Sequence, residues 1–328
     1  MNSACIWGTG AALPEKVITN FDLEKMVETT DEWITTRTGI KERRQAAPHQ
    51  TTSSLSVQAS RKALEMAGVS PSDLNLIICS TISPDMPLPS TAAFIQTALG
   101  APSCCSFDLA AACSGFLFGM TVADQFIKTN KAKHVLVIGA ELLSRYLDYQ
   151  DRATCVIFGD GAGAVILEPA DDALGVIDFL HEMDGSGGCA LFMPGGGSLN
   201  PATHETVDQK MHYVHQDGQA VFKFAVRKMA ELCEKLLERN GLSGKDVDLF
   251  IPHQANRRII SATADRLGMP MEKVIIDIDR YGNTTSATIP LAMSTAREEG
   301  KLKKGDLVLL AAVGAGFTVG TTLLRWAY

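Results

Sequence analysis

The sequence predicts an α/β protein built from two similar halves. Hydrophobic residues make up 46% of its 328 residues and charged residues 20%, with 28 glycines, which is typical of a compact α/β enzyme. The length exceeds the size at which a single core usually stops growing, so two packed halves are allowed. Two pairs of similar segments also recur at a shared offset of about 172 residues, which favours an internal duplication.

The repeat joins helices and strands in the same order. Segments 68–78 and 241–251 each follow an amphipathic helix and lead into an apolar strand, and the strand at 133–137 is echoed at 305–309. One match alone can arise by chance. Two matches at one offset predict a duplicated βα domain.

The first half begins with a strand followed by two predicted helices. Asn20 is expected to cap a helix over about 21–28, and helical spacing of apolar residues predicts a helix over 51–67 that ends at Gly68. The elements predicted beyond it are strands at 74–79 and 134–138, a helix at 91–99 and an apolar run at 154–167.

A proline-rich turn and a long insertion interrupt these elements. Residues 84–89 cannot form a helix or a central strand, so they place Leu88 on a projecting loop. Residues 183–218 form a long irregular segment rich in glycine and histidine. Its histidines at 204, 212 and 215 allow a metal site, but exposed loop histidines are the simpler explanation, and 204–208 falls one residue short of a zinc-protease motif.

Charge and cysteine usage exclude several classes of protein. A formal net charge of -7 argues against a nucleic-acid binder, so an anionic ligand must find local arginines. The eight cysteines contain no C-x-x-C pair, which predicts reduced thiols in the cytoplasm and no zinc site. The first eight residues lack signal-peptide features, and the longest apolar run, 307–319, is too short for a membrane span. Gly159–Gly163 lacks the third glycine of a dinucleotide fingerprint, so we expect no nicotinamide.

Cys113 lies at a transition from strand to helix. An apolar strand near 106–109 stops at three alanines, and the cysteine then opens a second apolar run. A thiol at a helix N-terminus meets free N–H groups and the positive end of the helix dipole, so we expect its pKa to be lowered. The alternative is an unreactive buried cysteine of the core.

Two further polar positions follow apolar strands. His253 is the first side chain after a strand that ends at Pro252, and Asn283 follows a strand predicted at 275–278. Ligands of open α/β sheets gather beyond the carboxyl ends of strands, so Cys113, His253 and Asn283 are expected to converge. Singly, His253 could be a core histidine and Asn283 a turn residue or helix cap; together they match the groups needed for acyl transfer.

The chain resembles the β-ketoacyl-acyl carrier protein synthase III family of the thiolase superfamily at its three active-site motifs, residues 111–115, 252–256 and 282–287. The resemblance covers essentially the whole chain and departs most in the insertion. It implies a thiolase-like fold, in which halves of βαβαβαββ order form a layered α-β-α-β-α sandwich. The predicted boundaries are 1–180 for the first half, 181–218 for the insertion and 219–328 for the second half.

The resemblance also implies a reaction. Cys113 would take an acyl group from acyl-CoA; malonyl-acyl carrier protein would then lose CO2 and give 3-oxoacyl-acyl carrier protein, with His253 and Asn283 donating hydrogen bonds to the enolate. The oxyanion hole would combine the N–H of Cys113 with one from Gly314, Ala315 or Gly316, and the family usually has glycine where Ala315 stands. Elongating synthases use two histidines and thiolases a second cysteine, so Asn283 indicates this reaction. CoA thioesters would be substrates, and no cofactor is implied.

Ligand contacts are implied in the same way. Trp33 and Arg152 would sandwich the CoA adenine, Arg37 would meet its phosphates, and Gly218 and Asn256 would line the pantetheine arm. Without the resemblance, Trp33 could equally be a partly exposed packing residue.

Partner contacts follow from the resemblance as well. Arg257 and Arg258 would contact the acidic carrier protein, with the resemblance pointing to Arg258; the alternative is that the two arginines form a solvated helix face. Family members are homodimers in which the loop position of Leu88 reaches the partner's acyl pocket. A leucine is smaller and more flexible than the phenylalanine often found at this position, which suggests that the pocket takes primers longer than acetyl. Two other functions stay open: a related condensing enzyme of secondary metabolism, and a non-catalytic partner subunit that binds acyl carriers.

Overall fold

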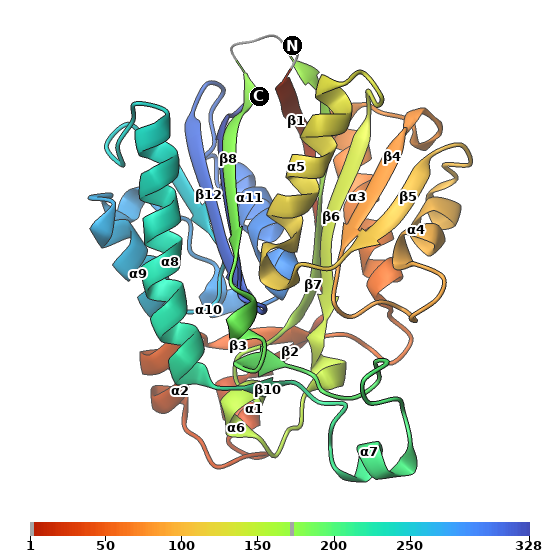
Figure 1. Cartoon of the computed structure of the whole chain (residues 1–328), viewed down its shortest axis with the longest axis vertical. Coiled ribbons are helices and arrows are strands. Elements are labelled where there is room, and N and C mark those ends of the chain that lie inside the picture. Colours follow the sequence, from red (N-terminus) through yellow and green to blue (C-terminus); the bar gives the residue numbers. More distant parts are fainter. Residues whose placement is uncertain (1–2, 171–173) are drawn as a thin grey trace.

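Two β-sheets lie face to face with two helices between them, and further helices cover the outer faces (Figure 1). A computed structural model describes residues 3–170 and 174–328 of the chain. The two central helices are α5 (Gly115–Lys128) and α11 (Thr288–Glu298). The layers therefore follow the order α-β-α-β-α, as expected from the resemblance.

The first sheet has five strands in the order β1-β7-β6-β4-β5. Strands β4, β5 and β6 run parallel, whereas β7 is antiparallel to both β1 and β6. Helices α3 (Thr52–Ala67) and α4 (Thr91–Leu99) pack on its outer face. The strands are β1 (Ser3–Ala12), β4 (Leu76–Ser80), β5 (Cys105–Leu109), β6 (Val135–Leu142) and β7 (Asp160–Ala170).

The second sheet repeats the arrangement of the first. Its order is β11-β12-β13-β8, which matches β4-β6-β7-β1, and β11 and β12 are again parallel. Helices α8 (Gly218–Arg239) and α9 (Arg257–Arg266) cover its outer face. The matching order supports the predicted duplication. The strands are β8 (Gly175–Met183), β11 (Leu249–Pro252), β12 (Leu307–Gly314) and β13 (Thr318–Arg325).

The boundary between the halves, as shown by sheet membership, lies before residue 180. The boundary predicted at residue 180 falls inside β8, which pairs with β13 in the second sheet. The sequence between 171 and 180 shows no break in composition that would mark the change of sheet. By pairing, the first half ends with β7 and the second begins with β8.

The core between the sheets is made by both halves. Phe116 and Leu117 from α5 and Ile289 from α11 are buried in one cluster with side chains of β4, β6, β11 and β12. Small residues let the helices approach the strands: a Cβ on Gly139 of β6 would lie 2.2 Å from the carbonyl oxygen of Ser286. The close contact fixes the turn before α11 against the first sheet.

Helix boundaries follow the capping residues. Helix α3 starts after Thr51, which forms a capping box with Ser54, and ends at Gly68 in the left-handed conformation, as predicted. The prediction for residues 21–28 was wrong. Helix α1 covers only Asn20–Leu23, and Thr19 rather than Asn20 caps it, because the Asn20 side-chain oxygen, which a cap would use, accepts instead from the Arg43 guanidinium at 2.9 Å.

Shorter elements gather at one end of the sandwich (Figure 1). The predicted apolar run at 154–167 divides here between a short helix, α6, and strand β7. The short elements are β2 (Lys16–Thr19), α2 (Asp31–Thr38), β3 (Glu42–Gln45), α6 (Arg152–Cys155), β9 (Leu191–Phe192), α7 (His204–Asp208), β10 (His215–Gln216) and α10 (Ile278–Tyr281).

The insertion folds as the two-stranded β9-β10 ribbon with α7. Its histidines have separate surroundings: His204 is exposed, His212 lies 3.0 Å from the Thr206 hydroxyl, and His215 stands against the ring of Phe192. Among residues 3–170 and 174–328, no group of three metal-ligating side chains comes together. Within the same residues, no helix is long and apolar enough to cross a membrane.

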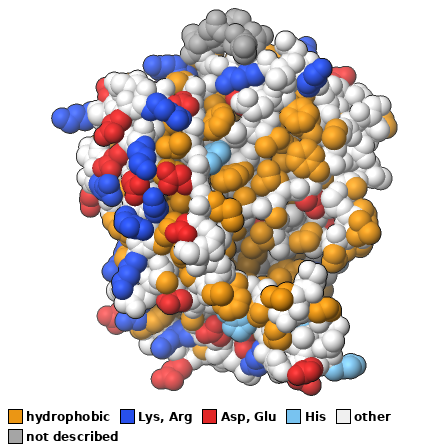
Figure 2. All heavy atoms as spheres, viewed as in Figure 1, with side chains coloured by type: hydrophobic (Ala, Val, Ile, Leu, Met, Phe, Trp, Pro, Cys, Tyr) orange, Lys and Arg blue, Asp and Glu red, His pale blue; other side chains and the backbone are white. Residues whose placement is uncertain are grey.

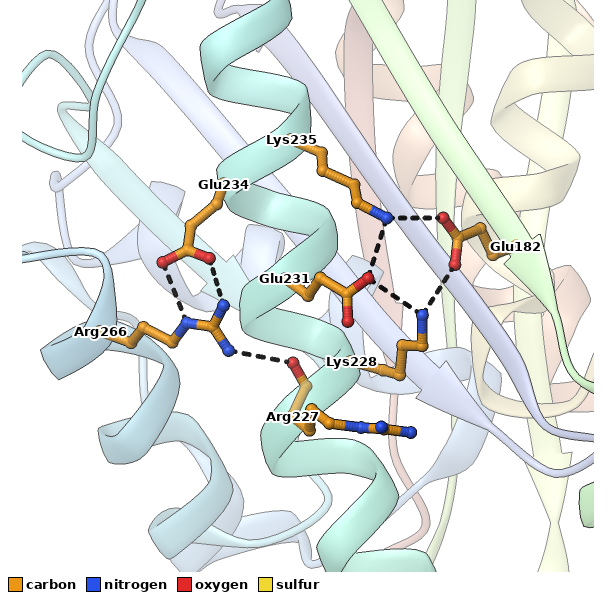
Figure 3. A network of polar contacts seen from close by, with 7 residues as sticks. All are labelled: Glu182, Arg227, Lys228, Glu231, Glu234, Lys235 and Arg266. Carbon is orange, nitrogen blue, oxygen red and sulfur yellow. Dashed lines mark hydrogen bonds and ion pairs between the residues drawn. The ribbon is translucent and has the colours of Figure 1, made fainter.

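Helix α8 is joined to its neighbours by an ion-pair network on the surface (Figure 3). Lys228 and Lys235 both bridge Glu231 of the same helix and Glu182 of β8, while Arg266 of α9 pairs with Glu234. Exposed pairs contribute about 0–1 kcal/mol each. The buried face of α8 therefore contributes more to its docking than the network does.

Candidate active site

Cys113, His253 and Asn283 line one cavity of about 90 Å³. Cys113 follows β5, and His253 directly follows β11. Asn283 follows the short helix α10; the strand predicted at 275–278 is reduced to a bridge between Phe250 and Val274. All three side chains nevertheless line the same cavity, so the expected convergence is found.

Cys113 sits in a 3₁₀ turn, Ala112–Ser114, that continues directly into α5. Its side chain is buried, and burial raises the pKa of the thiol to about 12, with a further rise from the Glu141 carboxyl and a smaller lowering by its own backbone N–H. The expected lowering of the Cys113 pKa was therefore wrong. A helix terminus supplies at most about 2 kcal/mol, whereas a rise from 9.0 to about 12 corresponds to roughly 4 kcal/mol.

The raised pKa predicts how Cys113 reacts with iodoacetamide. Only the thiolate is alkylated, so below the pKa the rate should rise about tenfold for each pH unit. We expect this rise to continue from pH 7 to pH 10 without a plateau, measured by mass spectrometry of the Cys113 peptide. A plateau below pH 8 would show that the helix terminus dominates over burial.

His253 is held by hydrogen bonds to strand β12 and to helix α11. Its backbone N–H donates to the Ala311 carbonyl at 2.7 Å, and its Nδ1 lies 2.6 Å from the Thr288 hydroxyl. Burial lowers the pKa of His253 to about 3. The imidazole is therefore neutral at physiological pH.

Asn283 has a fixed side-chain amide. The Asn283 backbone donates to the Ile157 carbonyl at 2.9 Å and accepts from Gly159 at 3.0 Å. The backbone N–H of Thr285 donates to Oδ1 at 2.8 Å, which leaves the Nδ2 group to donate elsewhere. Gly282, at φ +63°, lets this turn form: a Cβ there would lie 2.9 Å from the Ile157 carbonyl oxygen.

The end of β12 packs against the Cys113 turn. A Cβ on Gly314 would lie 2.7 Å from the Cys113 nitrogen, so only glycine permits this contact. The Thr318 hydroxyl donates to the Ala111 carbonyl at 3.1 Å and joins the two segments. Ala315 lines a second cavity beside Cys113, and Gly316 lies next to Thr318. Of the predicted oxyanion residues, Gly314 therefore lies against the Cys113 backbone, and Ala315 lines a cavity that Cys113 also lines.

The second cavity has a volume of about 230 Å³ and is mainly apolar. It adjoins the first, since Cys113, Phe158 and Leu191 line both. Leu191 belongs to β9, so the insertion supplies part of the wall. The remaining lining residues are Ile82, Ala112, Leu143, Tyr146, Phe192, Met193, Val214, Thr285 and Ala315.

The residues that are expected to bind CoA extend from the first cavity to the surface. Gly218 and Asn256 line the cavity, and the Asn256 amide donates to the Arg37 carbonyl at 2.9 Å. The guanidinium groups of Arg37 and Arg152 lie 4.4 Å and 4.6 Å from the ring centroid of Trp33. An adenine between Trp33 and Arg152 therefore requires Arg152 to move off the ring.

The remaining predicted contacts lie on the surface. Arg257 and Arg258 are exposed at the start of α9, and the Arg258 guanidinium lies 4.8 Å from the ring centroid of Phe222, which lines the first cavity. Leu88 is 84% exposed, in agreement with the predicted projecting loop.

Glu141 is a buried polar residue near the site that sequence reasoning missed. It lies one residue before the end of the apolar strand β6, where only its charge distinguishes it. Its carboxyl accepts from the Ile82 N–H at 3.0 Å, the Ser83 hydroxyl at 2.7 Å and the Ser286 hydroxyl at 3.1 Å, and burial raises its pKa to about 7. Glu141 thus ties the loop before Leu88 to the turn that carries Asn283.

Family models and related sequences both identify the same protein family. Residues 107–185 match the family model described as 3-oxoacyl-[acyl-carrier-protein (ACP)] synthase III, and residues 237–326 match the model of its C-terminal part. A relative from Koribacter versatilis, named beta-ketoacyl-[acyl-carrier-protein] synthase III, is 59% identical over 99% of this chain and 98% of its own length. A relative of the same name from Solibacter usitatus is 56% identical over 100% of both chains.

Solved structures give the same result for the fold. The crystal structure of 3-oxoacyl-[acyl-carrier-protein] synthase III from Aquifex aeolicus aligns with a TM-score of 0.91 at 47% identity, over 98% of this chain and 100% of that one. The synthase III from Thermus thermophilus aligns with a TM-score of 0.92 at 39% identity, over 98% of this chain and 99% of that one. With the Cys-His-Asn cavity and the layered fold, these similarities assign the chain to the β-ketoacyl-acyl carrier protein synthase III family, whose members are condensing acyltransferases.

Proposed function

We propose that this chain catalyses the first condensation of fatty-acid synthesis, in which acyl-CoA and malonyl-acyl carrier protein give 3-oxoacyl-acyl carrier protein, CoA and CO2. The observation that carries the proposal is that Cys113, His253 and Asn283 line one cavity, beside an apolar cavity that can hold the acyl chain. A nucleophile and two donors in one enclosed site suit acyl transfer followed by enolate formation.

In the first step the Cys113 sulfur attacks the thioester carbonyl of acyl-CoA. A carbon–sulfur bond to Cys113 forms, the bond to CoA breaks, and the proton lost from the thiol leaves on the CoA sulfur. The Cys113 N–H and one amide of Gly314, Ala315 or Gly316 donate to the oxygen that becomes negative. The acyl group then extends into the apolar cavity.

In the second step malonyl-acyl carrier protein enters the cavity emptied by CoA. Its carboxylate leaves as CO2, and the electron pair of the broken carbon–carbon bond forms an enolate. His253 and Asn283 donate hydrogen bonds to the enolate oxygen. The enolate carbon attacks the acyl carbon on Cys113, a carbon–carbon bond forms, and Cys113 leaves as a thiolate that takes a proton from solvent.

The substrate contacts are part of the proposal. Trp33 and Arg152 take the adenine of CoA after Arg152 swings away, and Arg37 meets the phosphates. Gly218 and Asn256 line the pantetheine arm, which passes through the first cavity. Arg257 and Arg258 are exposed beside that cavity, where an acidic carrier protein can reach both.

The nucleophile and the hydrogen-bond donors of both steps come from the protein's own residues, so we propose that no cofactor is needed beyond the thioester substrates. Reaction mixtures that contain EDTA and no nicotinamide should form product at the same rate as mixtures without EDTA and with added nicotinamide cofactor. Because the eight cysteines are free thiols, we also propose that the enzyme works in the reducing cytoplasm.

We further propose a homodimer formed through the free edge of the first sheet. Strand β5 has β4 on one side only, and Phe107 and Leu109 on it are partly exposed. Figure 2 shows hydrophobic side chains gathered on the face where β5, β6 and α5 lie in Figure 1. A second copy placed there would cover this face and bring Leu88 toward the partner's acyl cavity.

Light scattering after gel filtration tests the dimer. We expect twice the chain mass of 35.2 kDa for the native protein and for Val207→Glu, a control on the exposed face of α7. Phe107→Glu should give the single-chain mass, because it buries a charge at the sheet edge. A native protein of single-chain mass would contradict the dimer.

The second cavity predicts the range of primers. A cavity of about 150 Å³ holds benzene, so one of about 230 Å³ accepts acyl chains longer than acetyl. We expect turnover of butyryl-CoA as well as acetyl-CoA, and Leu143→Phe should reduce butyryl relative to acetyl turnover by about tenfold. Turnover of acetyl-CoA alone by the native protein, with none of butyryl- or octanoyl-CoA, would contradict this.

A further inference from the structure

One short segment, residues 283–288, determines which side-chain atoms of His253 and Asn283 can donate hydrogen bonds. The Thr285 N–H donates to Oδ1 of Asn283 at 2.8 Å and so fixes which end of the amide donates. The hydroxyl of Thr288, the first residue of α11, lies 2.6 Å from Nδ1 of His253. Both Thr288 and His253 are buried.

The hydrogen of the His253 ring decides whether the ring can donate. Burial keeps the imidazole neutral, because it lowers the pKa of His253 to about 3. A neutral imidazole carries hydrogen on one nitrogen and a lone pair on the other. In the described part of the chain, the hydrogen-bond partner of Nδ1 is the Thr288 hydroxyl. The orientation of that hydroxyl and the tautomer of the ring are therefore linked.

The Thr288 hydroxyl has one hydrogen and two acceptors within reach. Nδ1 of His253 lies at 2.6 Å and the Thr285 carbonyl oxygen at 3.0 Å. The backbone N–H of Thr288 already donates to that carbonyl. Turning the hydroxyl toward Nδ1 therefore leaves no carbonyl without a partner. With the hydroxyl turned the other way, Nδ1 must carry the hydrogen, and Nε2 cannot donate.

We propose that Thr288 is a positioning residue whose hydroxyl donates to Nδ1 of His253 and thereby keeps the ring hydrogen on Nε2. This inference rests on the proposed function, in which the enolate oxygen accepts hydrogen bonds from both His253 and Asn283. Thr288 acts through His253 and leaves the acylation of Cys113 unchanged. Its branched side chain restricts the rotamer and holds the hydroxyl beside the ring.

Three variants separate this role from a merely structural one. Thr288→Val removes the hydroxyl with little change of shape, Thr288→Ser retains it, and Thr263→Val removes a similarly buried hydroxyl from α9. At saturating malonyl-acyl carrier protein, Thr288→Val should release CO2 about 10- to 100-fold more slowly than the native enzyme. Thr288→Ser should restore most of that rate, Thr263→Val should match the native protein, and all three should form the acyl adduct on Cys113.

Nitrogen NMR of protein labelled with ¹⁵N-histidine reads the tautomer directly, with the His253 signals assigned from their loss in His253→Ala. The native enzyme should carry hydrogen on Nε2 of His253. Hydrogen on Nδ1, or native CO2 release by Thr288→Val, would overturn the inference. If Thr288→Val does not fold, the native spectrum and the serine variant still decide. Absence of any condensation product from the native enzyme would instead refute the proposed function.

Discussion

Cys113→Ala is expected to abolish condensation and the acyl adduct together. The proposed reaction passes through a covalent bond to the Cys113 sulfur, and the described cavity offers no second thiol. Removing a nucleophile that acts within a catalytic unit costs roughly 10³-fold or more in turnover. The measurement is the rate of 3-oxoacyl-acyl carrier protein formation, with intact-protein mass spectrometry after incubation with acyl-CoA.

A second buried cysteine gives the matched control. Cys233 lies on α8 in the core of the second half, fully buried, and it lines neither cavity. Cys233→Ala should retain the adduct and most of the turnover, although it removes the same atom from a similar depth. An adduct of equal amount on Cys113→Ala would show that the acyl group is carried elsewhere.

Asn283→Asp is expected to stop decarboxylation while acylation of Cys113 continues. The aspartate keeps the oxygen that accepts from the Thr285 N–H, so the turn is preserved, but it replaces the donating amide with a second oxygen. The enolate oxygen then faces an acceptor in place of a donor. Loss of one such donor costs about 10²- to 10³-fold, and repulsion between like charges adds to the loss.

The two half-reactions are measured separately in this test. Release of CO2 from malonyl-acyl carrier protein should fall for both Asn283→Asp and Asn283→Ala, while the acyl adduct on Cys113 forms within a few-fold of the native rate. Equal losses in both half-reactions would point to damage of the fold. Native CO2 release by Asn283→Asp would exclude Asn283 as a donor to the enolate.

The positions of the site residues could be predicted because they follow local rules. Helix α3 occupies the predicted range and ends at Gly68, and the two sheets share one strand order, as expected of the predicted duplication. His253 directly follows a strand that ends in proline, so its place beyond the sheet was evident. These signals depend on neighbours in the sequence, and the structure agrees with them.

Properties that depend on burial could not be predicted in the same way. The sequence places Cys113 at a helix terminus but does not show how completely the other half covers it, and that burial reverses the direction of its pKa. The partner of the His253 ring, Thr288, lies 35 positions away in a helix whose small residues give no sign of it. Glu141 is hidden in the same way within an apolar strand.

The strand predicted before Asn283 and the helix predicted after residue 20 show a further reason why sequence-based prediction of local structure fails. Residues 275–278 have a strand-like composition, yet the chain leaves the sheet after one bridge because Gln254 takes the backbone N–H groups of Asp277 and Ile278. Asn20 is a residue type that often caps helices, but its side-chain oxygen accepts from Arg43 and is not free to cap. Competing tertiary hydrogen bonds decide both cases.

The central claim is that acyl-CoA acylates Cys113 and that the acyl group is then transferred, in the same cavity, to a carbon derived from malonyl-acyl carrier protein. Intact-protein mass spectrometry of the native enzyme tests it most directly, with butyryl-CoA added first and malonyl-acyl carrier protein added after CoA is removed. We expect a single butyryl adduct on Cys113 that disappears after the second addition, in step with an equal amount of 3-oxohexanoyl-acyl carrier protein. An adduct that persists, or product that forms without any adduct, would contradict the claim.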